Sequence, residues 1–433
     1  MISFITLLAA AISPMDTGSI ESSSASYDGS MLVLDGEVSL HHGFGNMKAE
    51  KAVLTRPPQE NAEFPFTSIE LAEAVKLSLS TNAQVECERA SLDFTSMQGT
   101  LTSPKNVHYV DTINATPFEL FSPQLDLQMV KNKDAYDIEK AHAQKGVHLI
   151  YDKLYHLNTE SILFANDKLL SEGNSCTWTC ENDRVDAEKF DLDVAQNHLH
   201  LQKAKGHLKS FSKGEVQFTA DDLSWTHTDN HLTLKGSPKV QETSLGTITS
   251  SQEIDLILKD QKLHNLKTKG PTELISHKGH SLKTAGQLVI DGEKQIATIH
   301  SQQTQLLYQE EEMSLMADEA QIHYREDETG LHPERVELQG NIKIFSQDRK
   351  GIADTLTYNP ETRTCILKAS TGKKVLFMRD QDQLRISANE IHITYDPVTH
   401  EQQVRGVGHI TMSLSPEEQT LLNQVFHHES STP

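Results

Sequence analysis

The 433-residue chain contains 22 histidines, four cysteines and 61 carboxylates, from which a metal site or an acid–base centre could be built. Their spacing favours neither, because no HExxH motif, nucleophile elbow or phosphate-binding loop occurs. His323 and His392 occupy polar positions of alternating segments, while His41-His42 and His427-His428 stand at a segment end and in the tail. We therefore predict solvated histidines, no catalytic residues, no metal, no cofactor and no enzymatic activity.

The four cysteines are Cys87, Cys176, Cys180 and Cys365, and no two have the CxxC spacing of a zinc or redox site. Cys176 and Cys180 flank Thr-Trp-Thr. Residues four apart on one strand lie ~13 Å apart, which is too far for a disulfide. The sequence therefore predicts four packed, unpaired thiols.

Acidic residues outnumber basic ones, with 61 Asp and Glu against 39 Lys and Arg and a net charge of −22. This balance argues against a nucleic-acid ligand, which requires basic patches, and against attraction to an anionic membrane surface. Only 36% of the residues are hydrophobic. A narrow array of repeats fits that fraction better than one large globule.

The elements that hold these residues are indicated most clearly by Val336–Ile344, in which every second residue is apolar or glycine. A period of two is typical of a strand with one buried and one solvent-exposed face. The same pattern recurs at 32–40, 232–240 and 404–412, with single departures. Four copies of one pattern indicate a repeat protein.

A second recurring signature begins with Ala, alternates apolar residues and ends in an aromatic residue. The clearest copies are Ala317–Tyr324, Ala353–Tyr358 and Ala388–Tyr395, with starts 36 and 35 residues apart. One unit is then a strand, a polar turn, a glycine-centred strand and a connection, which allows about twelve units along the chain. The pattern is irregular over 100–215, where bulges are expected, and Thr55–Pro65 is expected to be a loop.

The recurring glycines are expected to be structural. A glycine inside a strand costs stability unless it permits a bend or a close approach. Repeated at one place in each unit, it predicts a line along which the strands fold over into two opposed sheets. The structural glycines are Gly36, Gly236, Gly340 and Gly406. The predicted fold is all-β, an elongated twisted β-jellyroll solenoid of antiparallel hairpin repeats with a short C-terminal capping helix.

This reading divides the chain into four parts: a signal peptide at 1–19, N-terminal jellyroll repeats at 20–215, C-terminal repeats at 216–414, and a capping helix with a tail at 415–433. The apolar run Ile2–Ile12 is too short to span a bilayer. It resembles the apolar region of a secretory signal, although no Lys or Arg precedes it. A truncated start or a buried first strand are the alternatives.

The predicted helix begins at Ser415-Pro416-Glu417-Glu418, which has the pattern of a capping box with proline at the first helical position. Leu421, Leu422, Val425 and Phe426 would lie on one face. We expect this helix to cover the open edge after the last strand.

Together these signatures resemble the OstA-like family of lipopolysaccharide-transport periplasmic proteins, of the LptA type. The matching segments are Ala317–Tyr324, Ala353–Tyr358, Leu34–Leu40 and Leu338–Ile344, and the match is best over 20–54 and 315–413. The resemblance implies a jellyroll in the periplasm, or on the periplasmic side of the outer membrane, whose apolar interior shields acyl chains during outer-membrane assembly. The family has no catalytic residues to transfer. This chain is far longer than the single bridge protein and lacks a C-terminal run of barrel strands.

The alternation alone places one set of apolar side chains between the two sheets, where they would line a lipid groove. These residues are Leu32, Leu34, Val38, Leu40, Leu232, Leu234, Val336, Leu338, Ile342, Ile344, Ile391, Ile393 and Tyr395. The alternative is a structural scaffold with a closed core and no lipid ligand.

Two kinds of partner follow from the sequence. Lipopolysaccharide or another lipid is the expected ligand, and no nucleic acid is expected. Another jellyroll could pair with an exposed first strand, Ser24–Tyr27. The charge of −22 would repel lipid phosphates unless a basic rim forms, for which the candidates are Lys343, Arg349, Lys350, Lys373 and Lys374.

Overall fold

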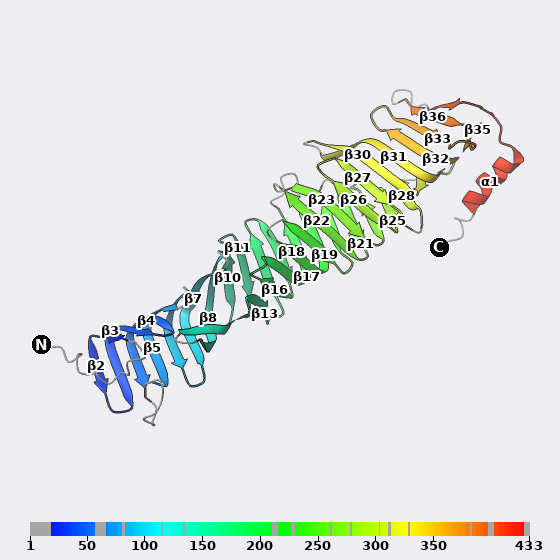
Figure 1. Cartoon of the computed structure of the whole chain (residues 1–433). Coiled ribbons are helices and arrows are strands. Elements are labelled where there is room, and N and C mark those ends of the chain that lie inside the picture. The colour runs from blue at the N-terminus through cyan, green and yellow to red at the C-terminus, as the bar shows by residue number, and fades with distance from the viewer. Residues whose placement is uncertain are drawn as a thin grey trace. The chain divides into compact units, whose positions relative to one another are not determined.

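The computed structural model describes residues 19–56, 66–79, 83–113, 116–132, 135–209, 215–226, 230–243, 245–259, 262–277, 279–302, 304–310, 313–327, 330–381, 383–396 and 402–427. The described residues form 37 strands and one helix, and the strand pairs are antiparallel (Figure 1). The all-β prediction is therefore confirmed. The signal-peptide prediction lies outside the described residues, as does most of the expected loop at Thr55–Pro65. Contacts divide the chain into two units, Met1–Ala204 and Lys205–Pro433.

Unit 1 consists of two sheets that share their long strands. The first half of β3 pairs with β2 and its second half with β1. At the other end of the set, the second half of β8 pairs with β9 and its first half with β10. We call the sheet containing β2 and β9 sheet I, and the sheet containing β1 and β10 sheet II.

The strands of unit 1 fall into three groups. Those that run through both sheets are β3 (Met31–His42), β4 (Gly45–Thr55), β5 (Ser68–Leu79), β6 (Gln84–Asp93), β7 (Gln98–Ile113) and β8 (Thr116–Asn132). Those of sheet I are β2 (Ser24–Tyr27), β9 (Ala135–Gln144), β12 (Ile162–Ala165), β13 (Lys168–Ser171) and β16 (Lys189–Asp193). Those of sheet II are β1 (Ser19–Glu21), β10 (Val147–Tyr151), β11 (Tyr155–Thr159), β14 (Cys176–Cys180) and β15 (Asp183–Ala187). The last strand to begin in unit 1, β17 (His198–Leu208), pairs with both β16 and β15.

Unit 2 repeats this arrangement with fewer shared strands, and we name its sheets I and II in the same way. The shared strands are β18 (Val216–Thr226), β31 (Gly330–Phe345) and β32 (Arg349–Asn359). Sheet I adds β19 (His231–Lys235), β22 (Glu253–Lys259), β23 (Lys262–Lys269), β26 (Gln287–Asp291), β27 (Ile296–His300), β30 (Glu319–Asp327), β33 (Thr364–Lys368), β36 (Glu390–Tyr395) and β37 (Gln402–Val407). Sheet II adds β20 (Lys239–Glu242), β21 (Gly246–Ser250), β24 (Thr272–Ile275), β25 (Ser281–Thr284), β28 (Leu306–Glu310), β29 (Met313–Ala317), β34 (Val375–Arg379) and β35 (Leu384–Ala388).

The core of each unit lies between its two sheets. In β3 the alternation buries Leu32, Leu34, Val38 and Leu40 on both sides of the bend, and each is at most 4% exposed. Each such side chain contributes roughly 1.5–3 kcal/mol on burial. Two phenylalanines from opposite sheets of unit 1, Phe118 and Phe164, meet with ring centroids 6.4 Å apart.

Each shared strand bends where it passes from one sheet to the other, and the bend is visible as a shift in pairing register. In β31 the shift lies between Gln339 and Ile342, where Gly340 and Asn341 have φ values of 81° and 46°. Only glycine adopts such a φ without cost, which explains the glycine at the first position. Gly36 and Gly236 have nearly the same φ and are likewise followed by a residue of positive φ.

The fourth predicted glycine differs, because the corner after β37 is made by Gly408, with φ 68°, and not by Gly406. A Cβ on Gly406 would lie 3.2 Å from the side chain of Ile410. The copy at 404–412 contains two glycines in alternation, and the pattern alone could not tell which of them bends the chain.

The helix α1 (Pro416–His427) begins with the predicted capping box. The Ser415 N–H donates to Glu418 Oε2 (2.8 Å), and the Glu418 N–H donates to Ser415 Oγ (3.2 Å). Leu422 is buried against Leu376 of β34, with Ile352 and Phe426 beside them.

The sequence predicted that the helix would cover the open edge after the last strand. It packs instead on the outward face of sheet II. Val375 and Phe377 alternate with Leu376, and all three are buried, so Leu376 is on the outward face of sheet II where α1 covers it. The edge strand β35 is met by the segment before the helix, through the bridge between Ser387 and Thr411, and by the first turn of α1, where the Ser387 hydroxyl donates to Glu418 Oε1 at 2.8 Å.

Candidate apolar seam

The connections of unit 2 leave its two sheets joined along one side. The link between β19 and β20, which contains Gly236 and Pro238, crosses from sheet I to sheet II, and the links β21–β22 and β23–β24 cross back and forth on the same side. The hairpins β20–β21 and β22–β23 each stay within one sheet. We call the first side the corner side, and the opposite side, where hairpin ends of the two sheets face each other, the seam.

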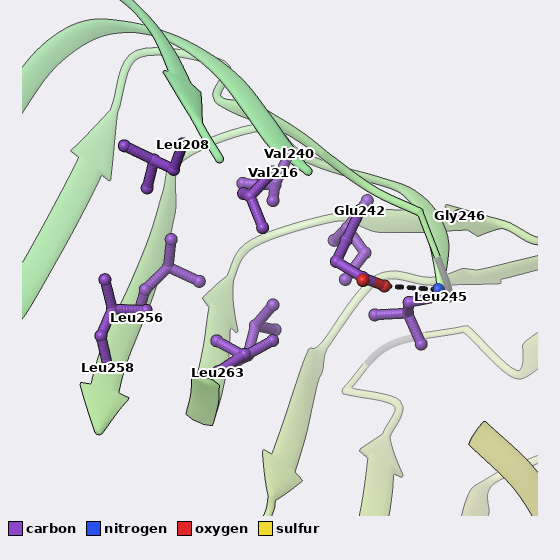
Figure 2. Close-up of a pocket in the computed structure, with 11 residues that line it drawn as sticks. Leu208, Val216, Val240, Glu242, Leu245, Gly246, Leu256, Leu258 and Leu263 are labelled. Carbon is purple, nitrogen blue, oxygen red and sulfur yellow. Dashed lines mark hydrogen bonds between the residues drawn. The ribbon is translucent and has the colours of Figure 1, made fainter. Parts of the chain in front are cut away.

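A small cavity lies between the sheets at this seam (Figure 2). Its lining comes from sheet II and the β17–β18 hairpin on one side and from β22 and β23 on the other. The lining residues are Leu208, Val216, Val240, Glu242, Leu245, Gly246, Ile248, Leu256, Leu258, Leu263 and Leu266. The free space is about 10 Å³, where one water needs ~10–15 Å³. The interior is therefore filled by leucine side chains at this point.

Glu242 is the charged residue in this lining. The Leu245 N–H donates to Glu242 Oε2 at 2.6 Å (Figure 2), so the carboxylate closes its own hairpin. The ring of His277 also approaches this hairpin, with Nε2 3.2 Å from the carbonyl oxygen of Glu242. The remaining surface offers aliphatic carbon, which binds alkyl groups and provides nothing to orient a polar ligand.

Further along sheet II, a polar cluster formed by His280, Tyr308 and Glu310 interrupts the apolar seam. The Tyr308 hydroxyl donates to Glu310 Oε2 at 3.0 Å, and His280 lies within 3.3 Å of the same carboxylate. Burial, followed by the Glu310 charge, raises the pKa of Tyr308. Burial also raises the pKa of Tyr358, on sheet I, and the Glu310 carboxylate contributes to that rise. Glu310 ends β28 and His280 stands in the β24–β25 turn, so the cluster lies at hairpin ends on the seam side.

The seam of unit 1 is bridged by specific contacts. The Tyr151 hydroxyl of sheet II donates to Asn197 Oδ1, in the turn between β16 and β17 of sheet I. Where the hairpin ends of β3 and β6 meet, the rings of His42 and Phe94 lie 4.9 Å apart. These contacts join the two sheets on the side opposite the corners.

The thirteen residues predicted to line a groove occupy inward positions of their strands. Ten are buried: Leu32, Leu34, Val38, Leu40, Leu232, Leu234, Leu338, Ile342, Ile391 and Ile393. Val336, Ile344 and Tyr395 are half-buried. The first four lie in unit 1 and the rest in unit 2, so they form parts of two cores and are not gathered at one site.

None of the thirteen lines the cavity. The cavity-lining leucines Leu256, Leu258 and Leu263 stand at hairpin ends, and the sequence signal that could have found them is the leucine-rich stretch around the β22–β23 turn. The alternation of apolar and polar residues identifies every inward position in the same way. It therefore does not distinguish an inward residue at a hairpin end, beside the seam, from one in the middle of the core.

Two of the candidate basic residues, Arg349 and Lys350, stand at the β31–β32 hairpin on the seam side, and the others lie elsewhere. Lys343 lies beside Ile352 on the outward face of sheet II, near α1. Lys373, on the corner side, pairs with Asp354 at 3.1 Å, and Arg349 pairs with Asp348 at 3.4 Å.

The four thiols are free. Cys87 and Cys176 are buried, and burial raises the pKa of each to about 12. Thiols of this kind are chemically inert, which agrees with the prediction of packed cysteines.

Within the described residues, no group of three or more His, Cys, Asp or Glu side chains is arranged to hold a metal ion. The same part of the chain contains no helix long and apolar enough to cross a membrane. The chain matches no protein-family model, and no curated protein matches it.

Proposed function

We propose that this chain is a non-catalytic envelope protein that holds the acyl chains of lipopolysaccharide, or of another lipid, between its two sheets. This is the role implied by its resemblance to the OstA-like, LptA-type proteins, and it would place the chain in the periplasm or at the periplasmic face of the outer membrane. The observation that carries the proposal is the aliphatic seam of unit 2, where the two sheets are joined along one side and end in hairpins along the other.

Opening this seam would leave the backbone hydrogen bonds intact. The ladders run within each sheet, from β19 through β22 and β23 in sheet I and from β20 through β21 and β24 in sheet II. Parting the sheets therefore breaks side-chain contacts only. An acyl chain inserted between them would regain about 0.8 kcal/mol for each buried CH₂ group.

The headgroup would remain outside in solvent. The charge of −22 repels phosphate groups. Lys343 and Lys373 lie away from the seam, and Arg349, at a hairpin end on the seam side, is paired with Asp348. Salt screens such repulsion over about 8–10 Å. Binding of a phosphorylated lipid should therefore strengthen with ionic strength.

A second jellyroll is the proposed protein partner. Strand β2 is exposed along its whole length and pairs with β3 on one side. An edge strand of this kind is a template for pairing with another chain. Deletion of residues 20–40 should abolish self-association measured by sedimentation, and unchanged association would exclude this edge.

The alternative function is a structural scaffold with a closed core, and a specific observation favours it: the cavity holds about 10 Å³ of free space and most of the inward residues are buried. A photo-crosslinking amino acid at Leu258, which lines the cavity, separates the two functions. The matched control is Lys267, an exposed residue of the neighbouring strand β23.

If the carrier proposal is right, added lipopolysaccharide crosslinks at position 258 and not at 267. Equal or absent crosslinking at the two positions favours the scaffold.

A further inference from the structure

Four side chains form a continuous row of rings on sheet II of unit 1. His108 stacks on Phe121 at 4.4 Å, Phe121 lies 6.0 Å from His148, and His148 stacks on His156 at 5.4 Å. The rings project outward, since His148 and His156 alternate with the buried residues Leu149 and Leu157. All four side chains are half-buried.

The hydrogen bonds of this row define the protonation of one ring. His148 Nδ1 is 2.9 Å from Asn158 Oδ1, an amide oxygen that can only accept. His148 Nδ1 therefore carries the proton, and its Nε2 presents a lone pair. His156 Nδ1 is 3.4 Å from that Nε2 and donates to it.

We propose that His148 and His156 form a bidentate site for a transition-metal dication such as Cu²⁺, Ni²⁺ or Zn²⁺. Two imidazole nitrogens bound at 2.0–2.1 Å to one tetrahedral ion are about 3.3–3.4 Å apart. That separation matches the 3.4 Å between His148 Nε2 and His156 Nδ1. On binding, His156 changes tautomer: the proton leaves Nδ1 to solvent and solvent returns one to Nε2. The ring stays neutral, and the metal lies between the Nδ1 lone pair of His156 and the Nε2 lone pair of His148.

Asn158 supplies the support that metal-binding histidines require. A ligating imidazole almost always donates its other N–H to an oxygen acceptor, which fixes the ring and its tautomer. His148 makes this contact before any ion is bound. The two free positions of the ion belong to water, since the described residues contain no three-residue metal cluster.

The charge of the protein favours a cation here. The chain has a net charge of −22. The carboxylate of Glu119 is 3.1 Å from His108 Nε2, and Glu119 belongs to β8, a strand that pairs with β10 in sheet II. Imidazole ligands select Cu²⁺, Ni²⁺ and Zn²⁺, whereas Mg²⁺ and Ca²⁺ require oxygen ligands. Affinity should follow the order Cu²⁺ above Ni²⁺ and Zn²⁺, with no response to Mg²⁺.

Tryptophan fluorescence offers a local test on the full chain. In the register between β11 and β14, His156 pairs with Thr179 and Leu157 with Trp178, so Trp178 lies on the inward face of sheet II, one strand away from His156. Trp225→Phe leaves Trp178 as the single tryptophan. CuCl₂ should quench its fluorescence saturably at one equivalent, and EDTA should restore it.

The variants His148→Gln and His156→Gln should raise the copper concentration for half-quenching by at least about tenfold, the usual loss when metal coordination is disturbed. His231→Gln is the control, because His231 lies in unit 2 beside Asp255. Zn²⁺ should also raise the melting temperature of the parent protein, and this rise should vanish in both variants. If neither substitution changes the copper quenching or the zinc-induced rise in melting temperature, the proposal is overturned. The proposal does not depend on lipid binding at the seam.

Discussion

Asp318 lies directly against Gly340, where the chain turns from sheet I of unit 2 into sheet II. The Asp318 N–H donates to the Gly340 carbonyl at 3.1 Å, and Asn341 Nδ2 donates to the Asp318 carboxylate at 2.8 Å. Ser23 and Gly36 meet in the same way in unit 1, with the N–H of Ser23 donating to the Gly36 carbonyl at 2.8 Å. The Ala-Asp signature and the glycine signature are thus two halves of one corner.

Replacing Gly340 with alanine should destabilise unit 2. A Cβ at this position would lie 2.8 Å from Asp318 Cβ, at a backbone φ of 81°. We expect a loss of about 1–3 kcal/mol, measured by urea unfolding. Gly372→Ala is the control, because its φ is 83° but its Cβ would meet nothing within 4 Å. Equal losses in the two variants would show that contact with Asp318 is unimportant.

The Tyr151 hydroxyl should stabilise the closed seam of unit 1. Tyr151→Phe removes its hydrogen bond to Asn197 while keeping the buried ring. The expected loss is about 0.5–1.5 kcal/mol, followed through the fluorescence of Trp178. Tyr27→Phe, which removes a bond to the Gly29 carbonyl at an exposed site, should have a smaller effect. A larger loss of stability in Tyr27→Phe than in Tyr151→Phe would contradict a seam bridged by Tyr151.

Docking of α1 should depend on pH through Glu418. Burial acts to raise the pKa of this carboxyl, but hydrogen bonds from the Ser415 N–H and the Ser387 hydroxyl outweigh it, and the net shift is downward. A lowered pKa in the folded state means that the ionised form stabilises the helix above the ordinary value near 4.5. This stabilisation is lost as the pH falls through the folded-state pKa.

Hydrogen exchange over Pro416–His427 can test this prediction. Exchange corrected for its intrinsic pH dependence should accelerate below about pH 4.5 in the parent protein. Glu418→Gln should accelerate it at pH 7, with little further change on acidification. Glu417→Gln, at the exposed neighbouring position, should behave like the parent. Identical exchange in the Glu417 and Glu418 variants would rule out the assigned role.

The buried thiols should be unreactive in the folded protein. Because burial raises the pKa of Cys87 and Cys176 to about 12, each is almost wholly protonated at pH 8. Reaction with a thiol reagent at these two positions should be slow until urea is added, as measured by mass spectrometry of peptides. Rapid labelling of either residue in the native protein would mean that its sheet opens readily.

The strand architecture could be predicted because alternation and glycine spacing are local signals. In β3 and β31 every second residue is apolar and marks the face that is buried, and Gly340 marks the position of the bend. The position of α1 could not be derived in this way, since it depends on Leu376, which faces outward from an otherwise ordinary strand. The consecutive apolar residues at 375–377 were the available signal for a sheet buried on both faces.

The cavity and the ring row were missed for a related reason. Leu245 and Leu258 line one cavity from hairpins of different sheets, and this arrangement depends on how the sheets face each other. His148 and His156 were predicted to be ordinary solvated histidines. Their pairing follows from the register of β10 with β11, which the spacing of histidines in the sequence does not reveal.

The proposal that lipid parts the two sheets can be tested by the distance between nitroxide labels on Gln241 of β20 and Lys267 of β23, both exposed, with the native cysteines replaced by alanine. Double electron–electron resonance should give a longer distance when lipopolysaccharide is added, because an acyl chain separates the sheets at the seam. A distance that stays the same at saturating lipid would contradict the carrier function and leave a closed scaffold.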